Sequence, residues 1–350
     1  MAPAAAPALG VAPAAVGYFV TLVYLGSMIG TATAGGWSAR FGPIRVSQVG
    51  LMLCLAGLAA AASGLLAAVI VGALLLGLGY GPATPASSMI LARAAPPHLL
   101  ALTFSIKQTG VPLGTAIAGA AVPALVLALM LIPIRTRYDA ARDRAAPASL
   151  RSAFAPVALV VRDRRLLELS LVSFIYGGMQ ITLIAYLVTF LVESFSLSLV
   201  LAGMVMAASQ FTSVAARIAW GAFADRFATR RVTLGMLGVG MGITAMSALA
   251  AGPHWPLWLL FTFAMVFGAT AVGWNGVFLA EIARLAPRDR IGDATGGSAF
   301  FTFLGVVLTP PLFHLALHLT SSYNVAYALF GLPALIAGAR LLLTAKIATQ

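Results

Sequence analysis

Two long apolar runs of this chain are joined by the charged stretch Trp220-Gly221-Ala222-Phe223-Ala224-Asp225-Arg226-Phe227-Ala228-Thr229-Arg230-Arg231. A fainter copy of this stretch occurs far upstream as Gly35-Gly36-Trp37-Ser38-Ala39-Arg40-Phe41-Gly42-Pro43-Ile44-Arg45, again between two apolar runs. Two copies of one turn, one in each half, indicate a membrane protein that is built from two related halves.

The composition of the chain agrees with a membrane protein. Of its 350 residues, 61% are hydrophobic and only 9% are charged, whereas a soluble domain carries roughly 25% charged residues. Its apolar runs repeatedly exceed the ~20 residues that a helix needs to cross a bilayer. We therefore expect an all-α polytopic membrane protein, whose first partner is the lipid bilayer itself.

About ten apolar stretches are long enough to be considered as membrane helices. Glycines and prolines inside them do not argue against helices, because neighbouring helices can satisfy the freed backbone groups. The stretches run approximately over Ala14–Gly36, Val46–Ala62, Leu65–Leu91, Thr109–Ile134, Leu166–Val192, Leu199–Ala224, Val232–Ala251, Pro256–Ala280, Thr295–Leu319 and Val325–Leu343.

The basic residues indicate how the chain is oriented. The 21 Lys and Arg residues outnumber the nine acids, which gives the chain a net charge of +12. They lie mainly in loops between the stretches, and such loops are typically cytoplasmic. This placement argues against a nucleic-acid partner and favours a multi-pass protein of the bacterial cytoplasmic membrane. The alternation fails at Thr109–Ile134, which has basic loops on both sides. Either this stretch is a re-entrant hairpin, or a span is missing here, or the large basic loop lies outside.

The longest polar segment, residues 135–165, is interpreted as a basic cytoplasmic linker. It divides the chain into an abbreviated N-terminal helical bundle over residues 1–134 and a six-helix C-terminal bundle over residues 166–350. The boundary between the halves is expected near Pro147.

The charged turn after the sixth stretch has a physical logic. Gly221 lets a neighbouring helix approach closely. Asp225 falls at a helix end, where a carboxylate can pair with an arginine or with the exposed amides of an adjacent helix. The arginines can anchor the turn to anionic headgroups. The simpler alternative is a basic stop signal after a membrane span, but the partial repeat in the first half favours the more specific interpretation.

The spacing Gly221-x-x-x-Asp225-Arg226-x-x-x-Arg230-Arg231 resembles a loop of the major facilitator superfamily, which lies there between helices two and three and again between helices eight and nine. Two further stretches are similar to helices four and ten of that family, Gly77-x-Gly79-Tyr80-Gly81-Pro82-Ala83-Thr84-Pro85 and Gly273-Trp274-Asn275-Gly276-Val277. The chain looks most similar to bacterial members near the cyanate and nitroimidazole transporters.

This resemblance implies two bundles of six helices that alternate access to a site near the membrane midplane. It implies a secondary active transporter for a small organic solute, an anion by preference, with or without a coupling ion. The charged turn would then act as a conformational gate, through Gly221, Asp225, Arg226, Arg230 and Arg231, with Arg40 in the fainter copy.

The chain departs from the family pattern in three ways. No stretch corresponds to the first helix, the fourth stretch looks like helix five fused to the end of helix six, and Ala39 stands where the family usually has Asp. These departures support an alternative function, a truncated, non-transporting remnant or a membrane-embedded partner protein.

Polar residues inside the apolar stretches are the candidates for a substrate path, because they are costly in a bilayer. The candidates are Lys107, Gln180, Gln210, Asn275, Trp274 and Tyr176. For most of them the alternative is an interhelical hydrogen bond that only holds the bundle together. Lys107 and Arg217 could each bind an anion or extend to the cytoplasmic surface, and for Arg217 we expect the surface.

His314 is the one titratable candidate at depth, as a possible proton site, and its alternative is a packing residue. The nine acids all fall outside the middle of a stretch. The sequence lacks the Gly-x-x-x-x-Gly-Lys-Ser/Thr loop of ATP-driven proteins. It also shows no cluster with metal-ligand spacing. We therefore expect no ATP, no metal, no cofactor and no enzymatic activity.

Overall fold

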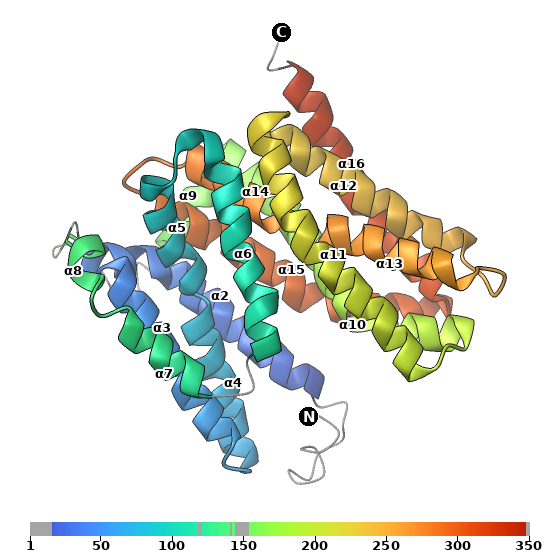
Figure 1. Cartoon of the computed structure of the whole chain (residues 1–350), viewed down its shortest axis with the longest axis horizontal. Helices are drawn as coiled ribbons and strands as arrows, with labels where there is room; N and C mark the ends of the chain where they lie inside the picture. Colours follow the sequence, from blue (N-terminus) through green and yellow to red (C-terminus); the bar gives the residue numbers. More distant parts are fainter. Residues whose placement is uncertain (1–15, 118–120, 141, 144–153, 348–350) are drawn as a thin grey trace. The chain divides into compact units, whose positions relative to one another are not determined.

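The structure is a computed structural model that describes residues 16–117, 121–140, 142–143 and 154–347, and no strand occurs among them. The expected boundary near Pro147 lies outside these residues. The helices are α2 (Val16–Phe41), α3 (Pro43–Ala61), α4 (Leu66–Tyr80), α5 (Ala83–Ala94), α6 (Leu100–Ile117), α7 (Ala121–Met130), α8 (Arg135–Tyr138), α9 (Ala155–Arg162), α10 (Arg164–Phe195), α11 (Leu199–Arg226), α12 (Arg230–Ser247), α13 (Leu257–Ala271), α14 (Asn275–Leu285), α15 (Ile291–Thr320) and α16 (Tyr323–Ile347), with short 3₁₀ turns at Pro97–Leu99 and Ala248–Ala250 (Figure 1).

The prediction of an all-α polytopic membrane fold is confirmed. Within the described ranges, nine helical spans are long and apolar enough to cross a bilayer. Two of these spans, Leu66–Ala94 and Leu257–Leu285, contain a short break, one between α4 and α5 and the other between α13 and α14. Each break contains a glycine, Gly81 or Gly273, and glycine stabilises a helix less than alanine does.

The fourth predicted stretch differs from its sequence-based outline. Where the sequence indicated Thr109–Ile134, the structure has two separate helices, α6 and α7. The helix α6 begins at Leu100, nine residues before the predicted start. The sequence pattern missed this start because Ser105, Lys107 and Gln108 interrupt the apolar run there. At 1.5 Å per residue, α7 is about 15 Å long, half of the ~30 Å core of a bilayer. The membrane topology of this segment stays a prediction.

The chain forms two compact units, and each is described by itself. The first unit comprises residues 1–94, 116–170 and 285–304. Here α4 packs against α2 and α3 through glycines. A Cβ atom added at Gly26 would lie 2.6 Å from the carbonyl oxygen of Leu74, and one added at Gly57 would lie 2.7 Å from that of Gly72. Small residues at these crossings allow the backbones to approach closely, as in other membrane helix pairs.

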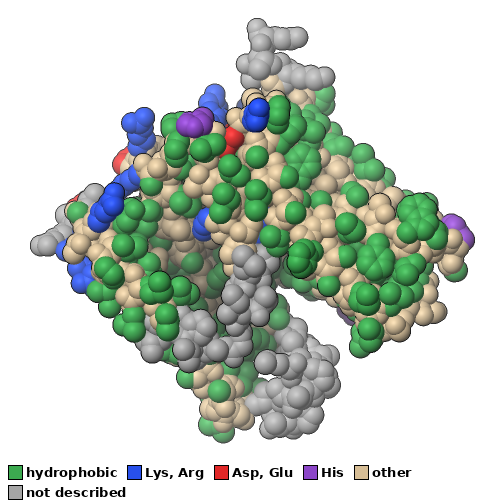
Figure 2. Space-filling view, viewed as in Figure 1, with side chains coloured by type: hydrophobic (Ala, Val, Ile, Leu, Met, Phe, Trp, Pro, Cys, Tyr) green, Lys and Arg blue, Asp and Glu red, His purple; other side chains and the backbone are tan. Residues whose placement is uncertain are grey.

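This unit also has a polar contact between α3 and α7 and a separation of apolar and basic side chains on its surface. The side chain of Gln48 on α3 donates from Nε2 to the carbonyl oxygen of Ala128 on α7, at 3.0 Å. Figure 2 shows hydrophobic side chains at the end of α7 that leads to α8 and basic side chains near α8. This separation is the pattern of helices that lie in lipid along their length and meet the headgroups at one end.

The second unit comprises residues 95–115, 171–284 and 305–350. Its helices α12 and α16 approach so closely that a Cβ added at Gly338 would lie 2.5 Å from the amide nitrogen of Val239. Buried aromatic rings fill its core, including Phe190, Phe267, Phe313 and Tyr327. The candidate functional residues lie mainly in this unit.

Candidate functional site

The break between α13 and α14 is the feature around which the candidate site is built. A break in a membrane helix frees backbone carbonyl groups that must find other donors. Arg217 of α11 donates from Nε to the carbonyl oxygen of Val272, at 3.1 Å. The indole Nε1 of Trp274 donates to the carbonyl oxygen of Ala271, also at 3.1 Å. Side chains therefore stabilise an interruption that the apolar surroundings would otherwise disfavour.

Arg217 corrects the expectation that its side chain extends to the membrane surface. The residue is only 3% exposed, and its Nη1 donates to the carbonyl oxygen of Gln108 on α6. Several N–H groups in a rigid planar fork allow one guanidinium to bridge carbonyls of two different helices. The backbone break and the adjacent α6 thus hold this cation inside the unit.

Lys107 lies one residue before the backbone group that Arg217 contacts. Its Nζ atom is buried, and no hydrogen-bond partner for it occurs within the described part of the chain. A buried ammonium group without a partner is costly, because it has lost its hydration shell and gained nothing in return. A bound anion would supply the missing partner.

The helix α6 reaches this region by a close approach at Ser105. A Cβ added at Gly276, in the first turn of α14, would lie 2.6 Å from the amide nitrogen of Ser105. A Cβ added at Gly221 of α11 would lie 2.7 Å from the Cβ of Ser105. The two glycines therefore let α6 pack directly on α14 and α11, which positions Lys107 two residues beyond this crossing.

Two predicted path residues are joined in the same unit. The side chain of Asn275, the first residue of α14, donates from Nδ2 to Oε1 of Gln180 on α10, at 2.9 Å. Both residues are partly buried. Neutral amides of this kind can hydrogen-bond a polar solute, and they can equally link two helices.

The remaining path candidates make packing contacts. The hydroxyl of Tyr176 donates to the carbonyl oxygen of Leu234 at 2.9 Å, and its ring lies edge-on to Trp274 with centroids 5.8 Å apart. Gln210 contacts the sulfur of Met206 one turn earlier in its own helix, at 3.9 Å. These contacts match the structural alternative, and a role in a substrate path stays a prediction for all three.

His314 is exposed on α15. Whether it carries a proton in transport stays a prediction.

The charged turn at the end of α11 contacts the start of α6. The carboxylate of Asp225 accepts from the backbone N–H groups of Ala101, at 3.1 Å, and Leu102, at 2.8 Å. It also forms an ion pair with Arg230, at 3.0 Å. The prediction that Asp225 would meet an arginine or the amides of an adjacent helix is confirmed on both counts. A carboxylate at this position complements the positive end of the helix.

The three arginines of this turn have different surroundings. Arg230 donates to the carbonyl oxygen of Pro97 at 3.2 Å, in addition to its pair with Asp225. Arg231 donates to the hydroxyl of Thr344 on α16 at 3.0 Å. Arg226 is exposed and lies over the ring of Phe227, 5.4 Å from its centroid. The expected anchoring to headgroups thus fits Arg226, whereas the other two contact protein groups.

The fainter copy of the turn has a carboxylate that the sequence did not reveal. Asp139, which follows α8, accepts from the backbone N–H groups of Ile44, at 2.9 Å, and Arg45, at 3.2 Å, at the start of α3. It is 1% exposed, and it packs against Gly42, whose φ of 98° favours glycine. Asp139 is thus the buried carboxylate next to the turn in which Ala39 stands at the usual Asp position. Arg40 lies over Phe41, 5.5 Å from its ring centroid.

Comparison with known proteins agrees with this architecture. A family model described as the Major Facilitator Superfamily matches residues 1–310 and 169–348. In solved structures, the chain is similar to the human organic anion transporter MFSD10, with a TM-score of 0.74, 18% identity and coverage of 97% of this chain and 88% of that one. It is also similar to the proton:xylose symporter XylE, with a TM-score of 0.73, 18% identity and coverage of 95% and 87%.

Among curated proteins, the chain is similar to two bacterial anion transporters. It is 33% identical over 169 residues to the "Probable nitrate/nitrite transporter NarK2" of Mycobacterium tuberculosis, covering 48% of this chain and 42% of the relative. It is 25% identical over 157 residues to the "Nitrate/nitrite transporter NrtP" of Nostoc punctiforme, covering 42% and 31%. The chain thus aligns with less than half the length of these curated relatives.

Proposed function

Because the chain belongs to the Major Facilitator Superfamily, we propose that it is a secondary active transporter that moves a small anion across the bacterial cytoplasmic membrane by alternating access. The sequence favoured a small organic solute, preferably an anion. The two curated relatives are named as nitrate/nitrite transporters, and these two ions are therefore the first solutes to test beside small carboxylates. The similarity to cyanate and nitroimidazole transporters stays a prediction.

The observation that carries this proposal is the buried amine of Lys107, which has no hydrogen-bond partner among the described residues. An anion bound there would form charge-assisted hydrogen bonds, which are about twice as strong as neutral ones. The positive charge inside the unit also disfavours a cationic solute.

The surroundings of Lys107 support a site for a small solute. Lys107 follows Ser105, which packs against Gly276 in the first turn of α14. A helix that starts inside a membrane presents its positive end to an anion, and such broken helices are typical of transporter binding sites. Arg217 adds a second buried cation beside the same break. The amides of Asn275 and Gln180 are neutral hydrogen-bonding groups from the same unit.

The charged turn is proposed as the gate of the transport cycle. Asp225 holds the first amides of α6, the helix that carries Lys107. A change in this contact would therefore move α6 and with it the amine of Lys107. His314 stays a candidate for proton coupling.

A flux measurement tests the function. Liposomes that contain the purified chain are loaded with labelled nitrate, nitrite or formate, and with labelled xylose as a neutral control. We expect saturable flux of at least one anion, competition by the same unlabelled anion and no flux of xylose. Absence of flux for every anion, or equal flux of xylose, would contradict the proposal. The first of these results would favour the alternative of a non-transporting membrane partner.

A further inference from the structure

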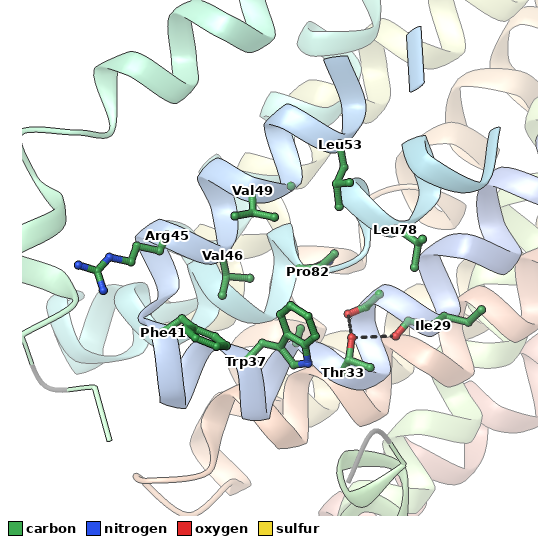
Figure 3. A pocket seen from close by; sticks show the side chains of 13 residues that line it. Ile29, Thr33, Trp37, Phe41, Arg45, Val46, Val49, Leu53, Leu78 and Pro82 are labelled. Carbon is green, nitrogen blue, oxygen red and sulfur yellow. Dashed lines mark hydrogen bonds between the residues drawn. The ribbon is translucent and has the colours of Figure 1, made fainter. Parts of the chain in front are cut away.

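An apolar groove lies on the first unit, between α2 and α3. Its volume is about 440 Å³. Ile29 and Trp37 of α2 line one side, Val49 and Leu53 of α3 line the other, and Pro82 lies between them in the view of Figure 3. The sides of the groove are therefore built from two membrane-spanning helices of this unit.

Several apolar side chains at this groove are exposed on the protein surface. Ile29 is 53% exposed, Val49 is 54% exposed, and Trp37 and Phe41 are each 41% exposed. In a bilayer such side chains are covered by hydrocarbon. The lining from Arg45 to Leu53 covers nine residues of α3, a rise of about 12 Å at 1.5 Å per residue. This length fits within one leaflet of the ~30 Å hydrocarbon core.

Positive charge is confined to one end of the groove. Arg45 lines that end, and Figure 3 shows its guanidinium directed away from the apolar side chains. Its Nε atom lies 4.0 Å from a carboxylate oxygen of Asp139, and its side chain stays 35% exposed. Arg40 adds a second guanidinium beside Phe41, which also lines the groove. Apolar surface along the groove and cations at its end match the form of an anionic lipid.

We propose that this groove binds one anionic phospholipid. An acyl chain lies between α2 and α3, against Val49 and Trp37, and the phosphate meets Arg45 and Arg40 at the turn between the helices. The basic character of this turn, which the sequence places on the cytoplasmic side, assigns the lipid to the cytoplasmic leaflet. The site is independent of the proposed solute site, which lies in the other unit.

The test uses the whole purified chain in detergent, stripped of native lipid. Binding of dioleoyl phosphatidylglycerol is compared with that of dioleoyl phosphatidylcholine and with glycerol 3-phosphate, by mass spectrometry of the intact lipid complexes. We expect phosphatidylglycerol to bind at least about fivefold more tightly than phosphatidylcholine, which is the contribution of a single arginine at a membrane surface. Glycerol 3-phosphate, which has no acyl chain, should not compete. Competition by it would reveal a simple phosphate site and would overturn the lipid proposal.

Two pairs of variants separate the headgroup from the acyl chain. Arg45→Gln should lower the preference for phosphatidylglycerol, because only Arg40 then remains, whereas Arg162→Gln, at an exposed arginine at the end of α9, should keep it. Val49→Trp should fill the groove and lower the binding of both lipids. Leu58→Trp, on the same helix but outside the groove, should lower neither.

Each of these variants can refute the proposal. Equal lipid binding in Val49→Trp and Leu58→Trp, or an unchanged preference in Arg45→Gln, would overturn it. If a second copy of the chain covers the groove, mass spectrometry should detect a dimer without bound lipid. This result would also overturn the lipid proposal.

Discussion

Replacing Asp225 with alanine is expected to destabilise the second unit strongly. The substitution removes the acceptor for the N–H groups of Ala101 and Leu102 and the partner of Arg230. The carboxylate is 4% exposed and the arginine side chain 15% exposed, so water replaces these contacts poorly. The first N–H groups of α6 lose their acceptor, and the guanidinium of Arg230 loses its counter-charge, in the same substitution.

The magnitude follows from the two kinds of contact. Loss of a helix cap costs about 1 kcal/mol. Breaking a buried ion pair by removing one partner costs about 3–5 kcal/mol, and the lower end applies because Arg230 keeps the carbonyl oxygen of Pro97. Because the two contributions share one carboxylate, we expect a total of about 3 kcal/mol. In a chain of 350 residues that loss should lower the unfolding midpoint by roughly 4 °C.

Thermal unfolding in one detergent, followed by circular dichroism, measures this shift. Asp163→Ala is the matched control, because Asp163 caps its own helix α10 through the N–H groups of Arg165 and Leu166 and is exposed. Asp225→Asn, which keeps an acceptor but loses the charge, should fall between the wild type and Asp225→Ala. If Asp225→Ala lowers the midpoint no more than Asp163→Ala, the bridge from the charged turn to α6 is energetically unimportant and the reasoning fails.

Three further substitutions test individual contacts by the same midpoint. Asp139→Ala should cost about 2–3 kcal/mol, because the first amides of α3 lose their buried acceptor, and an unchanged midpoint would show that Asp139 is not a cap. Tyr176→Phe should cost about 1 kcal/mol for one buried hydrogen bond, and a loss of flux without any loss of stability would instead place it in the substrate path. Gly276→Val should cost about 1–3 kcal/mol through contact with Ser105, whereas normal stability would contradict the close approach of α6 and α14.

The sequence predicted those features that depend on local composition. Long apolar runs became membrane helices because a bilayer requires each backbone group to be satisfied within its own helix. The repeated turn indicated the fold family because its motif is local in the sequence. A glycine and a carboxylate at fixed spacing need only an adjacent helix to contact. Asp225 met both kinds of partner that its chemistry allowed.

Contacts between distant segments could not be predicted in this way. Asp139 lies 95 residues from Ile44, whose backbone N–H donates to its carboxylate, and nothing in the linker distinguishes Asp139 from the neighbouring Asp143. Arg217 was expected at the surface because a lone arginine near a helix end usually extends there. Its burial depends on the break between α13 and α14, which appears in the sequence only as Gly273 within an apolar run.

The central claim is that the buried amine of Lys107 holds the transported anion, and the nitrate dependence of flux tests it most directly. Lys107→Gln should raise KM at least tenfold, because a charge-assisted hydrogen bond contributes about 1.5–3 kcal/mol and 1.4 kcal/mol is a factor of ten. Lys107→Arg, which keeps the charge, should recover part of the affinity, and Arg288→Gln, an exposed control, should leave KM unchanged. A Lys107→Gln protein that transports nitrate with the KM of the wild type would contradict the account.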